Sequence, residues 1–159
     1  MQKIETLEYA SFWRRVAAFI IDTFFILCLL LPFGFVPMDQ IGLVMIVIQM
    51  IYYVGFEGSF QQATPGKKLL KIKVTDMQGQ RVSYWRALAR IFAFTVLPIL
   101  VSFIYGIILR TNIPDLTISL IVFTAPFVID CSLILISKKK QSLHDLIAGC
   151  LVVRNEATE

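Results

Sequence analysis

The sequence predicts an all-α membrane protein with four transmembrane helices in two hairpins and a small cytoplasmic β element. Hydrophobic residues make up 57% of the 159 residues, against about 45–50% in typical soluble domains. The mean hydropathy of +0.75 agrees with this. The net charge of +4 comes from basic residues that flank apolar runs, so membrane topology explains it better than nucleic-acid binding does. We expect one membrane domain over residues 1–159.

Four apolar runs account for the predicted helices, since a membrane-spanning helix takes about 20 residues. The runs cover residues 16–36, 41–56, 91–109 and 116–136. The second run is short, so a tilted or re-entrant segment is an alternative there. Short links at 37–40 and 110–115 predict two helical hairpins.

The basic residues predict the orientation. An even number of spans places fourteen of the fifteen Lys and Arg residues on one side and leaves only Arg110 opposite. The positive-inside rule then puts both termini, the loop 57–90 and the tail 137–159 in the cytoplasm. We therefore expect a multi-pass protein of the cell membrane.

The loop and tail carry the predicted β element. Residues 71–75 alternate polar and apolar side chains, as a half-buried strand does, and residues 150–154 are a second strand candidate. Thr64 to Lys67 reads as a turn, and Ser83 is placed to cap the third long helix. The alternative is a solvated basic loop near anionic lipid.

Asp22 stands within the first apolar run, where a carboxylate costs roughly 2.5–3.5 kcal/mol. Arg15 lies seven positions earlier, which places it on the same helix face, about 10 Å away. Such a charge usually faces a partner or water inside a helix bundle. This stripe is therefore a candidate functional feature.

Three more polar residues lie at a similar depth when each helix is counted inward from the cytoplasmic edge. Asp22 and Asp130 come out about 10 Å deep, Gln49 about 12 Å and Thr95 about 8 Å. Together they predict a hydrated cavity or an ion or proton site, in which neighbouring Asp22 and Asp130 would raise one carboxyl pKa. The alternative, favoured for Gln49 and Thr95, is local helix–helix contacts.

The tail contains one more candidate, His144-Asp145. Asp145 is either an ordinary surface charge or the partner of Arg14, Arg15 or Arg86 in a cytoplasmic latch or gate. No nucleophile–base pair, phosphate-binding loop or metal-ligand spacing is present in the sequence, including around Cys28, Cys131 and Cys150. We therefore expect no enzyme activity, no cofactor and no metal.

Four motifs together resemble the RDD family of small membrane proteins. They are Phe12-Trp13-Arg14-Arg15 with Asp22, Thr64-Pro65-Gly66-Lys67-Lys68-Leu69-Leu70, Arg86-Ala87 with Arg90, and Gln141-Ser142-Leu143-His144-Asp145 with Ala148-Gly149. The resemblance implies a charged trio of one arginine and two aspartates, which maps to Arg15, Asp22 and Asp145, with Arg14 competing for the arginine. Cys150 departs from the family's usual Thr. The family is largely uncharacterised, and some members have been linked to cation/proton exchange.

Two functions follow as expectations. The first is transport-related: a homo-oligomer that moves a proton and a monovalent cation or small solute past Asp22 and Asp130. The second is a scaffold or assembly factor that binds a membrane protein partner or anionic lipid through its basic cytoplasmic face. Neither involves nucleic acid.

Overall fold

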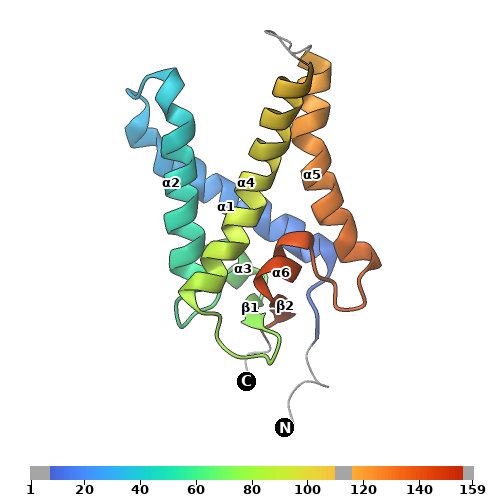
Figure 1. The fold of residues 1–159 in the computed structure, drawn as a ribbon. Helices are drawn as coiled ribbons and strands as arrows, with labels where there is room; N and C mark the ends of the chain where they lie inside the picture. The colour runs from blue at the N-terminus through green and yellow to red at the C-terminus, as the bar shows by residue number, and fades with distance from the viewer. Residues whose placement is uncertain (1–7, 110–115, 156–159) are drawn as a thin grey trace.

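A computed structural model describes residues 8–109 and 116–155 of the chain. Long helices form most of it, and short elements gather at one end of them (Figure 1). In chain order the elements are α1 (Phe12–Leu30), a 3-10 turn η1 (Leu31–Phe33), α2 (Met38–Glu57), α3 (Pro65–Leu69), β1 (Ile72–Asp76), α4 (Tyr84–Leu109), α5 (Leu116–Ile136), α6 (Leu143–Ala148) and β2 (Cys150–Arg154).

Within the described residues, three helical stretches are long and apolar enough to cross a membrane. They are Phe12–Phe33, Gln40–Glu57 and Tyr84–Val101. The fourth predicted span corresponds to α5, whose described apolar part is Phe127–Ile136. The predicted link at 110–115, with Arg110, lies outside the described residues.

The helix boundaries differ from the predicted ones for local reasons. The α-helical part of the first run ends at Leu30, and Pro32 then lies in the 3-10 turn, because proline disfavours a continuing α-helix. The second helix has 20 residues rather than sixteen, which removes the length argument for a re-entrant segment. The third begins at Tyr84, with the Ser83 Oγ accepting from the backbone N–H of Arg86 at 3.3 Å. This confirms the predicted cap.

The predicted turn at Thr64 to Lys67 is wrong, because these residues begin α3. Thr64 is the N-cap, and its Oγ1 accepts from the backbone N–H of Lys67. Pro65 occupies the first helical position, where its missing N–H leaves no hydrogen bond unmade. The Thr-Pro-Gly sequence therefore starts a helix here.

The predicted β element is confirmed. Strands β1 and β2 pair antiparallel, with Ile72 opposite Arg154 and Asp76 opposite Cys150. The segment before α1 joins on the other side of β2, where the Ala10 N–H donates to the carbonyl of Val152 at 2.9 Å. A core of small and β-branched side chains, among them Val74 and Val152, is fully buried here.

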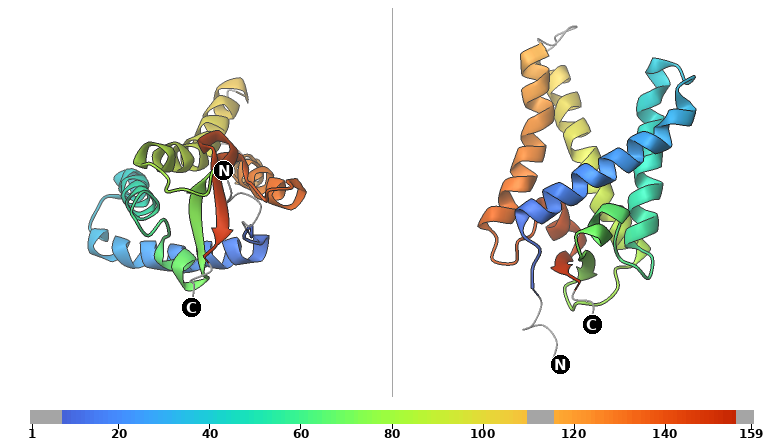
Figure 2. Two further views of the ribbon diagram at one scale, coloured as in Figure 1. Left: turned by 90° about the horizontal axis from the view of Figure 1, so that it is seen from below. Right: turned by 180° about the vertical axis from the view of Figure 1, so that it is seen from behind.

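The sheet closes one end of the helix bundle. Figure 2 shows α4 between α2 and α5, α1 crossing them obliquely, and the two strands beneath. Toward the other end α1 and α2 diverge from α4 and α5, which lie side by side there (Figures 1 and 2). The polar side chains described next lie where the helices meet the sheet.

Candidate functional site

Asp22 joins three helices through neutral hydrogen-bond donors. Its Oδ1 accepts from the Tyr52 hydroxyl and from the Gly66 N–H, each at 2.8 Å, and its Oδ2 accepts from the Thr64 hydroxyl at 2.5 Å. The side chain is fully buried. Both oxygens are therefore engaged, and the carboxylate holds α3 and α2 against α1.

Small residues allow this close approach of α3 to α1. Ala18 lies one turn before Asp22 and is fully buried. A Cβ at Gly66 would lie 2.4 Å from the Ala18 carbonyl oxygen and 2.8 Å from the Asp22 Oδ1. Glycine at position 66 is thus a steric requirement of the Asp22 contact.

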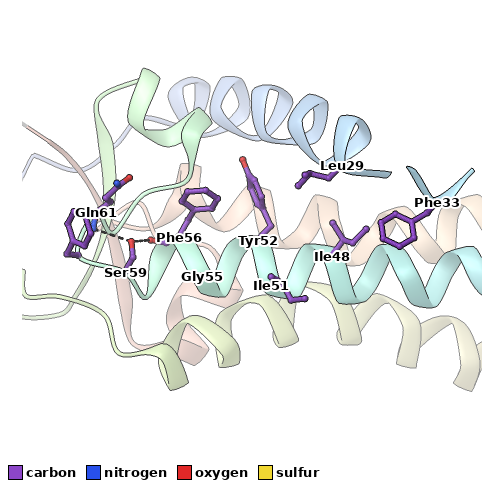
Figure 3. Close-up of a pocket in the computed structure, with 10 residues that line it drawn as sticks. Leu29, Phe33, Ile48, Ile51, Tyr52, Gly55, Phe56, Ser59 and Gln61 are labelled. Carbon is purple, nitrogen blue, oxygen red and sulfur yellow. Dashed lines mark hydrogen bonds between the residues drawn. The ribbon is translucent and has the colours of Figure 1, made fainter. Parts of the chain in front are cut away.

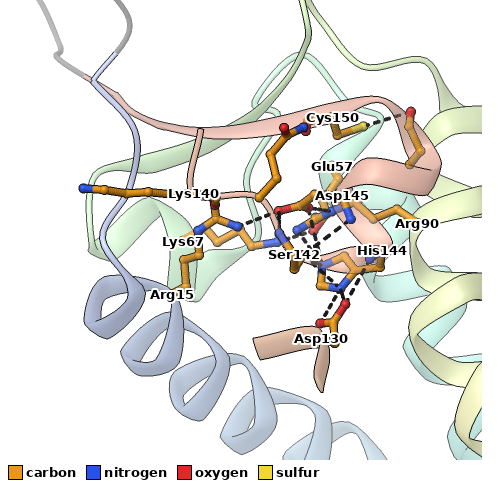
Figure 4. A network of polar contacts seen from close by, with 12 residues as sticks. Arg15, Glu57, Lys67, Arg90, Asp130, Lys140, Ser142, His144, Asp145 and Cys150 are labelled. Atoms are coloured by element: carbon orange, nitrogen blue, oxygen red, sulfur yellow. Dashed lines mark hydrogen bonds and ion pairs between the residues drawn. The ribbon is translucent and has the colours of Figure 1, made fainter. Parts of the chain in front are cut away.

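We call the contacts of Asp22 with Tyr52, Thr64 and Gly66 the clamp. A network of buried ion pairs lies beside it (Figure 4). Asp145 accepts from Arg15 at 2.6 Å and from the Nε of Arg90 at 2.7 Å. Arg90 also donates to Glu57 at 2.6 Å, and Lys67 donates to the other oxygen of Glu57. Each of the two carboxylates is thus shared by two cations, and the network ties α1, α2, α3, α4 and α6 together.

The short helix α6 aims Asp145 at this network. Asp145 is the third residue of α6 and forms a capping box with Ser142, in which each side chain accepts from the other residue's backbone N–H. Gly149 ends the helix in the left-handed conformation at φ 62°. Arg15 also donates to the carbonyl of Lys140 at 2.5 Å, so it fixes the chain just before α6.

Electrostatics keeps the network charged. Burial by itself would raise the pKa of Asp145, but Arg90, His144 and Arg15 hold that pKa well below its usual range. Burial lowers the pKa of Lys67, and Glu57 acts against that shift. Asp145 therefore stays ionised throughout the physiological pH range.

Asp130 reaches the same network through His144. Its carboxylate accepts from the His144 backbone N–H at 2.9 Å and lies 2.8 Å from the ring Nδ1. The ring Nε2 lies 3.2 Å from Arg90 Nη2 and 3.5 Å from the nearer oxygen of Asp145. An imidazole thus bridges the carboxylate of α5 and the ion pairs of α4 and α6.

The predicted candidates separate into two groups. Arg15, Asp145 and His144 come together, whereas Arg14 donates to the Leu70 carbonyl and Arg86 pairs with Asp76 at 3.7 Å. Of the three arginines predicted as partners of Asp145, Arg15 forms the pair, and neither Arg14 nor Arg86 does.

Asp22 and Asp130 do not touch in the described geometry, because each contacts its own donors. Gln49 is half-buried on α2. The buried hydroxyl of Thr95 has no hydrogen-bond partner among the described residues. A joint role of these four residues stays a prediction.

Five residues of the site were not predicted: Tyr52, Glu57, Thr64, Lys67 and Arg90. Glu57 ends the second apolar run and Arg90 precedes the third, so both read as ordinary boundary charges. Thr64 and Lys67 belong to the segment for which the sequence predicts a turn. One sequence signal indicates the Glu57–Arg90 ion pair: the two opposite charges lie at the same end of adjacent predicted helices and so at the same depth.

One cavity of ≈ 590 Å³ brings the two sets of polar groups to a common space. Its apolar walls come mostly from α1, α4 and α5. Its floor carries three acidic groups, Asp22, Glu57 and Asp130, and three basic groups, Arg15, Lys67 and Arg90. His144 also lines it. Among the residues that the structure describes, no three His, Cys, Asp or Glu side chains are grouped to hold a metal ion.

A second cavity of ≈ 510 Å³ lies between the end of α1 and α2 (Figure 3). Leu29, Phe33, Ile48 and Ile51 contribute to its apolar lining, with Tyr52 at one side. None of the described residues that line it is Asp, Glu, Lys, Arg or His. The charged cavity is therefore the candidate functional site.

Apolar helices of spanning length, closed at one end by an ion-paired cap, define a small integral membrane protein. The chain belongs to the RDD family, whose model matches residues 9–149.

A curated relative is "Uncharacterized protein YxaI" of Bacillus subtilis (strain 168), which is 46% identical over 52 residues. That match covers 33% of this chain and 34% of the relative, so it spans about a third of each. No solved structure matches the chain.

Proposed function

We propose that this RDD protein is transport-related and moves a small solute or a monovalent cation in exchange for protons, without converting it chemically. The observation that carries the proposal is the single cavity lined by both Asp22 and Asp130. Intramembrane carboxylates that face such a space are typical of proton and ion pathways.

The contacts suggest separate roles for the residues. Asp130 and His144 are the proton-exchanging pair, because a carboxylate and an imidazole 2.8 Å apart can pass a proton. Asp22, whose oxygens are both engaged, positions α3 and Lys67. Arg15 and Asp145 form the cytoplasmic latch that holds the cap on the bundle.

The proposal includes a topology. In it α1, α2, α4 and α5 all cross the cell membrane, and both termini and the sheet lie in the cytoplasm. The distribution of basic residues supports this orientation. So does the location of β1, β2 and α6 at one end of the helices. Because four helices in two diverging pairs enclose little space, we propose that the protein works as a homo-oligomer.

Flux measurements in proteoliposomes test the proposal. Purified protein is assayed for Na⁺, K⁺, Li⁺ and H⁺ movement, and we expect Asp130→Asn to lower the coupled rate by an order of magnitude or more. Glu8→Gln is the matched carboxylate-to-amide control, since Glu8 is exposed and lies outside the cavity. A rate in Asp130→Asn equal to that of the control removes Asp130 from the mechanism, and wild-type flux in Asp22→Asn removes Asp22.

A specific observation favours the alternative, a scaffold or assembly factor. Asp22, Glu57 and Asp145 are all engaged by internal donors, as expected of groups that hold helices in register. The basic residues Lys138 to Lys140 are exposed and would recruit a protein partner or anionic lipid. A stoichiometric partner in pull-downs, together with no flux in liposomes, supports this alternative over transport.

A further inference from the structure

The charged cavity is open toward the membrane along one side. Three of its lining residues are also largely exposed: Trp13 of α1 at 76%, Val128 of α5 at 60% and Leu135 of α5 at 69%. All three are apolar or aromatic: Trp13 belongs to a stretch of spanning length, and Val128 and Leu135 belong to the shorter apolar stretch of α5. A molecule dissolved in the bilayer can therefore enter between α1 and α5 without passing through water.

The lining of the cavity includes a residue with a buried donor that has no described acceptor. The side chain of Arg15 is only 10% exposed, and no described residue accepts a hydrogen bond from its Nε. The three carboxylates of the floor are already engaged: Asp22 by Tyr52, Thr64 and Gly66, Glu57 by Lys67 and Arg90, and Asp130 by His144. Two nitrogens of Arg15 are engaged by Asp145 and by the Lys140 carbonyl, and its Nε is the donor left for an acidic group.

We propose that this cavity binds an anionic membrane lipid, with its acidic headgroup at Arg15 and an acyl chain between α1 and α5. The inference rests on the proposed function in that it names the class of solute taken up at the same site. The volume of ≈ 590 Å³ lies within the range of about 300–1,000 Å³ that small-molecule sites occupy. The apolar walls suit a hydrocarbon chain and the buried guanidinium suits a phosphate or carboxylate.

The two tryptophans of the chain provide a matched pair of reporters. Trp13 lines the cavity, whereas Trp85 is exposed at the start of α4 outside it. Trp85→Phe leaves Trp13 as the only reporter, and Trp13→Phe leaves Trp85. Each full-length variant is placed in nanodiscs that contain either dibrominated phosphatidylglycerol or dibrominated phosphatidylcholine, and quenching of the remaining tryptophan is measured.

We expect phosphatidylglycerol to quench Trp13 with an apparent affinity about fivefold above that of phosphatidylcholine, the preference that one basic side chain gives for an anionic lipid. Trp85 should show a smaller preference. In the Trp85→Phe background, Val128→Phe should abolish the preference for phosphatidylglycerol in the quenching of Trp13, because the larger side chain fills the cavity entrance between α1 and α5. Val47→Phe, at an exposed apolar position of α2 outside the cavity, should keep it.

Equal quenching of Trp13 by the two lipids overturns the inference. An equal preference for phosphatidylglycerol at Trp85 and Trp13 also overturns it, and so does a preference at Trp13 that remains in Val128→Phe. Either result would come from lipid around the protein rather than inside the cavity. Flux measured on the same variants keeps the two proposals apart. Retained cation flux without a lipid preference at Trp13 refutes the lipid site alone, and a lipid preference without any flux refutes transport alone.

Discussion

Two buried aspartates of this protein are stabilised in different ways. Asp22 receives three neutral donors from Tyr52, Thr64 and Gly66, whereas Asp145 lies between two guanidinium groups. Removing the first carboxylate leaves unsatisfied donors, at about 1–3 kcal/mol each. Removing the second leaves buried cations without their counter-charge, which typically costs about 3–5 kcal/mol. The two aspartates therefore stabilise the fold by different means, Asp22 by satisfying buried donors and Asp145 by neutralising buried cations.

The depressed pKa of Asp145 predicts an acid-dependent loss of stability. Because its pKa in the folded state is below the unfolded value of about 3.9, the folded state binds fewer protons. The stabilisation is complete above about pH 4 and falls as the pH drops below that value. We expect the melting temperature of detergent-solubilised wild type to exceed that of Asp145→Asn by a constant margin from pH 7 to pH 5, and by a shrinking margin below about pH 4.

Glu8→Gln is the control for this titration. Glu8 pairs with Arg154 on the exposed side of the sheet, so its amide variant should track wild type closely. A margin between wild type and Asp145→Asn that stays constant down to pH 3 would contradict the ionised, ion-paired state of Asp145.

Much of the latch could be predicted at the residue scale, but not all of it. The helix period predicts Arg15 and Asp22 on one face, and it leaves Asp145 as either a surface charge or the partner of Arg14, Arg15 or Arg86. The period alone left Arg14 and Arg15 equivalent in charge and depth. What separates them is the direction of α6, which brings Asp145 to Arg15, whereas Arg14 reaches the carbonyl of Leu70.

At the scale of elements, α3 depends on its surroundings. A helix of five residues is far too short to be stable alone. It persists because Thr64 caps it and because Asp22 accepts from Gly66 and Thr64. Its position in turn brings Lys67 to Glu57, so α3 connects the clamp at Asp22 to the ion-pair network.

Gly66→Ala tests this dependence. The new Cβ would lie 2.4 Å from the Ala18 carbonyl oxygen, so α3 must move away from α1, at a cost of about 1–3 kcal/mol. We expect a clearly lower melting temperature. Gly55→Ala is the matched control, because a Cβ at position 55 meets nothing within 4 Å and favours the helix by about 0.5–1 kcal/mol. Equal melting temperatures for the two variants would show that α3 does not pack tightly on α1.

The elements of regular pattern could be predicted, and the one that depends on tertiary contact could not. The long helices followed from apolar length, and β1 and β2 followed from alternation in the loop and tail. Thr64-Pro65-Gly66 fits both a turn and a capped helix start, and local sequence does not separate the two. The acceptor that decides between them, Asp22, is more than forty residues away.

At the scale of the whole molecule, the charged residues and the β element share one end. The segment before α1 pairs with β2, and β2 pairs with β1 from the loop between α2 and α4. The two ends of the described chain and its central loop are thus on one side of the helices. This is compatible with an even number of membrane crossings, four in the proposed topology.

Cysteine labelling in cells tests that topology. Phe35, between η1 and α2, is 99% exposed, and Lys139, after α5, is exposed at the opposite end. Cys28 and Cys131 are replaced by Ala. Cys150 remains, because burial raises the pKa of its thiol to about 11 and keeps it protonated and unreactive. We expect a membrane-impermeant maleimide to label Phe35→Cys in intact cells and Lys139→Cys only after permeabilisation.

Three long helices, α2, α4 and α5, separate these two positions, so the labelling pattern also reports the number of crossings. The opposite pattern, with Lys139→Cys labelled in intact cells and Phe35→Cys protected, would mean that the basic cap is outside and that the positive-inside rule fails for this chain. Labelling of both positions from the same side would mean that one of the three helices does not cross. Because the sheet joins the segment before α1, the central loop and the tail after α5, that outcome would place the exception in α2, the helix that separates Phe35 from the central loop.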